Sequence, residues 1–121
     1  MNIRKIFLSS VVLLCLDFIY LTTFDKFFNK IIYTIQGSKI KINILGAILC
    51  YSLLIYGLNY FIIDQKKTVW NAFVLGVVIY GVYETTNYAL FDKWPVSAVI
   101  VDTLWGGILL ALTTMIVKRL I

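Results

Sequence analysis

Long apolar runs dominate this sequence, and its charged residues are confined to short clusters between them. A helix of ~20 apolar residues crosses the hydrocarbon core of a bilayer, and several such runs in one short chain are not expected of a soluble domain. The runs cover about residues 6–24, 42–63, 70–91 and 95–117. We therefore predict a single integral membrane domain, residues 1–121, with four spans and almost nothing outside the bilayer.

The connections between the runs indicate how the spans pack. Residues 64–69 and 92–94 are too few for anything but tight reversals between antiparallel neighbours. Pro95 suits the start of the last helix. The predicted fold class is therefore all-α, a membrane-spanning four-helix bundle.

The first connection, residues 25–41, is longer and has a helical pattern of its own. Its Phe and Ile residues recur at helical spacing against Lys and Asn, which is typical of an amphipathic helix lying at the membrane interface. Gly37 would end this helix. A simple continuation of the first span beyond the membrane fits the same residues, and the sequence does not choose between the two.

The first run follows Arg4 and Lys5, as the core of a cleaved signal peptide would. It is longer than a typical signal core, contains Asp17, and has no small-residue cleavage site before Asp25. We predict a retained helix.

The distribution of Lys and Arg gives a slight preference for one orientation. With the N-terminus in the cytoplasm, six basic residues lie inside and five outside, which favours cytoplasmic termini. The inside set is Arg4, Lys5, Lys66, Lys67, Lys118 and Arg119, and the outside set is Lys26, Lys30, Lys39, Lys41 and Lys93.

Composition excludes some classes of function. The net charge of +5 sits at the ends of apolar runs, where Lys and Arg contact lipid headgroups, so nucleic acid is not an expected partner. Cys15 and Cys50 lie inside apolar runs, and we expect neither a disulfide nor a metal site. Histidine is absent, which leaves carboxyl groups as the main candidates for acid-base chemistry.

Asp17, Glu84 and Asp102 lie inside the predicted spans, where burying an ionised carboxyl group is costly. Each is about seven residues from the same membrane face, which puts all three ~10 Å below it at the rise of an α-helix. They should converge on one cavity that opens toward that face. Because no Lys or Arg lies within the spans, at least one carboxyl group should hold a proton or a cation.

Polar and aromatic side chains accompany these acids at the same depth. Tyr20 lies near Asp17, Tyr83 and Asn87 lie near Glu84, and Trp105 lies one turn from Asp102. We predict that the seven residues form a ligand- or ion-binding pocket. The alternative is an interhelical hydrogen-bond network that only holds the helices together.

Several of these residues belong to a pattern that spans nearly the whole chain. It comprises Leu16-Asp17 with Tyr20-Leu21, Tyr33, Gly37, the segment from Gly81 to Ala89, Trp94, and Asp102 with Trp105-Gly106. This pattern resembles the small four-span membrane family called domain of unknown function 2177, which has Asp at the position of Glu84 and often Trp at that of Tyr20. The resemblance implies the architecture and the pocket residues but no reaction.

The leading functional hypothesis is proton- or cation-linked transport or binding of a small or lipid-like ligand. A membrane enzyme acting on a lipid or isoprenoid, with two acids as general acid and base, is the second, so enzymatic activity stays open. A purely structural membrane protein is the third. Small residues such as Gly76 and Gly107 suit close helix packing and a homo-oligomer in the lipid bilayer. The sequence identifies neither the ligand nor a cofactor.

Overall fold

The structure is a computed structural model that describes residues 2–121, and it is built from helices joined by short connections. The described part of the chain contains no strand, which confirms the all-helical prediction. The elements are α1 (Ile3–Thr23), α2 (Asp25–Gln36), α3 (Ile44–Leu58), a π-helical turn η1 (Asn59–Ile63) that continues α3, α4 (Val69–Leu90) and α5 (Val96–Leu120).

Three helical segments are long and apolar enough to cross a membrane: Ile3–Thr23, Ile44–Ile63 and Val96–Leu120. The prediction that α4 is also apolar enough to cross is wrong. This helix has sufficient length at 22 residues, but its polar side chains lower its apolar content. They are Asn71 near its start and Glu84, Thr85, Thr86 and Asn87 near its end.

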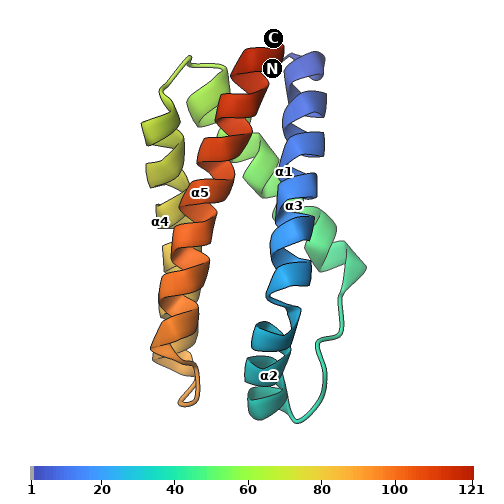
Figure 1. Ribbon diagram of the computed structural model, residues 1–121, viewed down its shortest axis with the longest axis vertical. Coiled ribbons are helices and arrows are strands. Elements are labelled where there is room, and N and C mark those ends of the chain that lie inside the picture. Colours follow the sequence, from blue (N-terminus) through green and yellow to red (C-terminus); the bar gives the residue numbers. More distant parts are fainter. Residues whose placement is uncertain (1) are drawn as a thin grey trace.

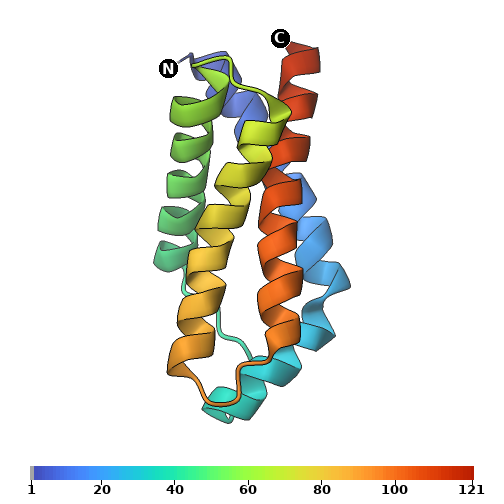
Figure 2. The ribbon, with the colours of Figure 1, turned by 90° about the vertical axis from the view of Figure 1, so that its left-hand side faces the viewer.

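A break at Phe24 separates α1 from α2, so the connection is not a simple continuation of the first span. α2 lies beside the end of the α4–α5 hairpin (Figures 1 and 2) and packs Ile31 against Trp94 and Ala98. It ends at Gly37, whose φ of +75° is the left-handed conformation that glycine adopts readily.

α4 and α5 form an antiparallel hairpin and pack along their whole length (Figures 1 and 2). The approach is close because Gly76 faces the backbone of Gly106 and Gly107, where a Cβ atom would collide. On the other side of α5 lies α1, and α3 packs chiefly against α1 and scarcely touches α4. The hairpin is therefore the tightest contact of the fold, whereas the contact between α3 and α4 is loose.

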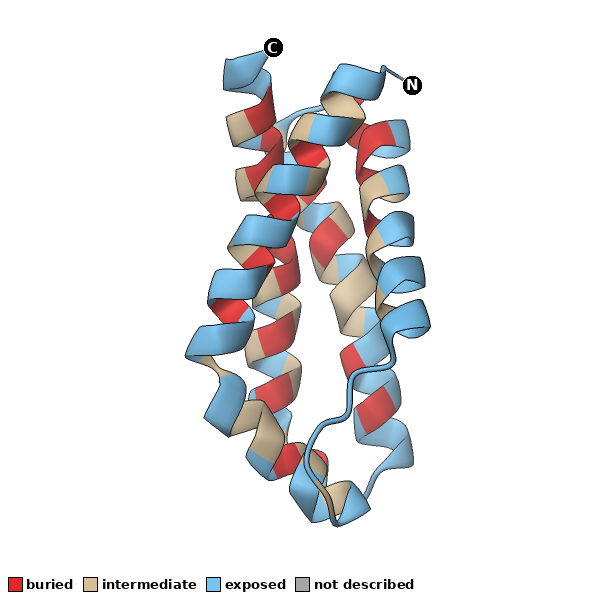
Figure 3. Cartoon of the chain, turned by 90° about the vertical axis from the view of Figure 1, so that its right-hand side faces the viewer, coloured by how far each residue is buried: buried red, intermediate tan, exposed pale blue. Residues whose placement is uncertain are grey.

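The core runs along the inner faces of the helices, whereas the outer faces carry exposed apolar side chains (Figure 3). Leu13, Leu58, Leu109 and Leu110 are fully buried and form a leucine layer near the middle of the molecule. Phe7, Phe18 and Leu53 are each about two-thirds exposed or more, at 66%, 67% and 72%. An outer surface of this kind suits contact with lipid.

Both termini lie at the same end of the molecule (Figure 1). The Arg4 side chain donates a hydrogen bond from Nη2 to the Leu120 carbonyl oxygen at 3.2 Å, so the first turn of α1 contacts the last turn of α5.

Candidate functional site

Asp17 on α1 joins three helices through its carboxyl group. The Trp105 indole on α5 donates from Nε1 to Oδ1 at 2.9 Å, and the Tyr51 hydroxyl on α3 donates to Oδ2. The side chain is only 5% exposed, so these donors replace the water that a carboxyl group would otherwise bind.

Asp102 on α5 accepts a hydrogen bond from the Tyr20 hydroxyl at 3.0 Å. The Tyr20 ring is stacked on the Trp105 indole, with centroids 4.6 Å apart and planes within 4° of parallel. The two aromatic side chains therefore form a rigid unit, and this unit donates to Asp17 on one side and to Asp102 on the other.

Glu84 on α4 is almost fully buried, at 1% exposed, and accepts from Nε1 of Trp94 at 2.9 Å. Glu84 and Asp102 line the same cavity, and their carboxyl groups lie close enough to interact. Two carboxyl groups can share a hydrogen bond only when one of them carries a proton. We call Glu84 and Asp102 the carboxyl pair.

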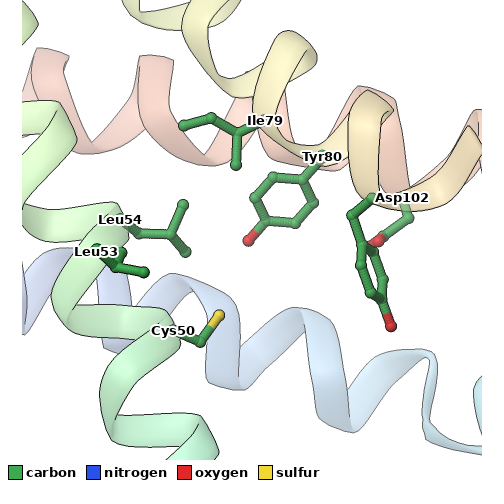
Figure 4. A pocket seen from close by; sticks show the side chains of 7 residues that line it. Cys50, Leu53, Leu54, Ile79, Tyr80 and Asp102 are labelled. Atoms are coloured by element: carbon green, nitrogen blue, oxygen red, sulfur yellow. The ribbon is translucent and has the colours of Figure 1, made fainter. Parts of the chain in front are cut away.

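A cavity of about 650 Å³ lies between α3 and α4, next to the carboxyl pair. Cys50, Leu53 and Leu54 of α3 face Ile79 and Tyr80 of α4 across it (Figure 4). Its remaining lining residues are Tyr83 and Asp102. We call this the apolar cavity, since its walls are mostly hydrocarbon.

A second cavity, of about 380 Å³, lies on the other side of Asp102, toward α2. It is lined by Glu84, Gln36 and Lys41 in addition to aromatic and aliphatic side chains. We call it the polar cavity. Tyr83 and Asp102 line both cavities and therefore stand at their junction.

The structure brings four of the seven predicted pocket residues into one hydrogen-bonded and stacked group, Asp17, Trp105, Tyr20 and Asp102, and Glu84 lines the polar cavity together with Tyr20 and Asp102. Tyr83 lines both cavities, although its side chain is 57% exposed. Asn87 lies on the buried face of α4, one turn beyond Glu84, but lines neither cavity.

The three acids form a row rather than one cluster. Within residues 2–121, no three His, Cys, Asp or Glu side chains are grouped closely enough to hold a metal ion. Asp17 lines neither cavity and is linked to the carboxyl pair through the Tyr20–Trp105 stack. Cys15 and Cys50 are free thiols at exposed positions.

Two donors of the site were not predicted as pocket residues. Trp94 lies in the α4–α5 turn and reaches back to Glu84, and Tyr51 donates to Asp17 from α3. Tyr51 shares the depth of the acids, which was a usable signal, and Trp94 belongs to the family pattern. Lys41 and Gln36 of the polar cavity carried no such signal, because they lie outside the predicted spans.

The family comparison is specific and covers nearly all of the chain. A family model described as "Predicted membrane protein (DUF2177)" matches residues 2–118. The chain belongs to this family. No curated protein and no solved structure matches the chain in the other two comparisons. Membership in DUF2177, together with three helices able to cross a bilayer, identifies an integral membrane protein.

Proposed function

We propose that this DUF2177 protein binds a small lipid-like ligand at the carboxyl pair, and that binding or transport of the ligand is linked to a proton. The observation that carries the proposal is the position of Asp102. Its carboxyl group stands where an apolar cavity meets a polar one, and it lies within reach of a second buried carboxyl group. An amphiphilic ligand needs both environments side by side.

In this proposal the carboxyl pair holds one proton and one negative charge. Tyr20 and Trp94 donate to the two carboxyl groups and keep them in place while the proton is present. A hydrogen-bond donor or cation on the ligand can take the place of that proton, because either stabilises two ionised carboxyl groups at close range. Ligand binding then releases a proton.

The proposal places all four long helices across the membrane, α4 included. Its support is the packing of α4 along the whole length of α5, with Gly76 against the α5 backbone. Glu84 and Asn87 point away from the lipid, since both are buried. α2 would then lie at the interface, and we propose cytoplasmic termini from the distribution of Lys and Arg.

Thermal unfolding of the purified protein in detergent, from pH 4 to 9 and with or without sodium, magnesium, calcium or zinc, tests the proposal. If the folded pair holds a proton that the unfolded chain releases, the folded state binds more protons, and stability must fall as the pH rises. We expect this alkaline loss in the parent. We expect it to disappear in Asp102→Asn and Glu84→Gln, because an amide group can donate to the remaining carboxylate without a titrating proton.

Asp92→Asn is the matched control, because Asp92 is exposed in the α4–α5 turn and should leave the pH profile unchanged. Asp17→Asn separates the third acid from the pair, and its profile should keep the alkaline loss. A parent profile that is flat with pH and with every ion, together with variants that are merely less stable, would identify the acids as structural and overturn the proposal.

A further inference from the structure

The two cavities differ in chemistry and share the lining residues Tyr83 and Asp102, and the order of their groups narrows the ligand class. A ligand that occupied both cavities would extend past Asp102 and Tyr83, which line both, to Glu84, which lines the polar cavity only. Lys41 lines the polar cavity alone. The path therefore runs from hydrocarbon, through hydrogen-bond acceptors, to a site with a positive charge.

The apolar cavity fits an alkyl chain. Its volume of about 650 Å³ lies within the range of ~300–1,000 Å³ that is usual for small-ligand sites. Leu53, Leu54 and Ile79 supply apolar walls, and the loose contact between α3 and α4 opens it toward the surrounding lipid. A chain can thus enter sideways without carrying its head through the molecule.

The carboxyl pair at the junction favours a ligand whose head group begins with a hydrogen-bond donor. Each carboxyl group of the pair accepts one aromatic donor, Tyr20 for Asp102 and Trp94 for Glu84, and a carboxylate has room for further donors. A hydroxyl group next to the alkyl chain would meet these oxygens. An anionic group in the same place would be repelled by the negative charge of the pair.

Lys41 selects for an anionic group farther along the head. Its ammonium group can form charge-assisted hydrogen bonds with a phosphate group, and it is the sole cationic side chain among the residues that line the polar cavity. Lys41 lies in the connection between α2 and α3, outside the helices, where its charge stays hydrated until a ligand arrives.

We infer that the ligand is an amphiphile with an alkyl chain, a hydroxyl group next to the chain and a phosphate beyond it, the order of groups in a lysophospholipid. This inference rests on the proposed function and names the ligand class of the same site. The juxtaposition that carries it is Asp102 at the junction and Lys41 beyond it.

Native mass spectrometry of the full chain in a nonionic detergent tests the order of groups with three probes. Palmitoyl lysophosphatidic acid has the chain, the hydroxyl and the phosphate, monopalmitoylglycerol lacks the phosphate, and hexadecyl phosphate lacks the hydroxyl. We expect lysophosphatidic acid to bind about tenfold more tightly than either of the others. Lys41→Ser should lower its affinity to that of monopalmitoylglycerol, and Lys39→Ser should not.

Lys39 is a matched control, because it is exposed in the same connection and lines neither cavity. Equal binding of lysophosphatidic acid and monopalmitoylglycerol, or equal loss in the two Lys variants, would overturn the inferred head group while the carboxyl pair keeps its proposed role. Absence of binding by all three probes, with the alkaline loss of stability intact, would overturn the ligand class and leave the proton-linked pair standing.

Discussion

Every carboxyl group of the site accepts a hydrogen bond from an aromatic side chain, and the pairings cross between elements. Indole and phenol groups suit this role, because they bring an apolar body into the core and a single donor to the acid. The acids are thereby held in fixed positions without a basic partner, which would neutralise them.

Trp94→Phe tests the importance of such a donor. The change leaves the Glu84 carboxyl group, 1% exposed, without its indole partner, which should lower stability by about 1–3 kcal/mol. Thermal unfolding in detergent measures the effect. Trp70→Phe is the control, since Trp70 is 67% exposed and stacks on Phe73. Equal destabilisation by both changes would contradict the structural role of the indole.

The sequence predicted the acids better than their partners. The rise of a helix is fixed, so counting residues from the span ends was enough to group Asp17, Glu84 and Asp102 at one depth. The hydrogen bond from Trp94 to Glu84 depends on the backbone path of the short α4–α5 turn. That path is set by how α4 and α5 pack against each other. Side chains that meet through tertiary packing leave no periodic signal.

At the scale of the helices, apolar runs located the long elements to within a few residues, but hydropathy alone does not account for α4. Two of its polar residues, Glu84 and Asn87, are buried, and Trp94 in the α4–α5 turn donates to Glu84, whereas Asn71, Thr85 and Thr86 are exposed. The π-helical end of α3 was not predicted either. There Asn59 donates from Nδ2 to the Ser9 hydroxyl oxygen at 2.9 Å, a contact with α1 that no local pattern indicates.

The close approach of α4 and α5 gives a prediction at this scale. Gly76→Ala should destabilise the protein by about 1–3 kcal/mol, because the new methyl group would collide with the α5 backbone. Gly57→Ala is the control, since a Cβ atom there meets nothing within 4 Å. Chemical or thermal unfolding of the two variants measures the difference. Similar stability of both would mean that the hairpin is looser than described.

Considered as a whole, the molecule is a set of long helices whose termini meet at one end. If α4 crosses the bilayer, the turn at Lys66 lies on the same side as the termini and the turn at Asp92 lies on the opposite side. Single-cysteine variants at these two positions, in a chain with Cys15 and Cys50 replaced by Ser, should react with a membrane-impermeant maleimide from opposite sides of intact cells. Labelling of both from one side would show that α4 does not cross.

The leucine layer would limit how a ligand bound at the proposed site could move through this protein. Leu13, Leu58, Leu109 and Leu110 are fully buried and lie between the acids and the end that carries the termini, so a ligand bound as proposed would meet a layer of leucines on that side. Under the proposed function, such a ligand would exchange with the leaflet on the opposite side. If that proposal is correct, the direction of insertion decides which leaflet supplies the ligand, and passage to the other leaflet requires the leucines to part.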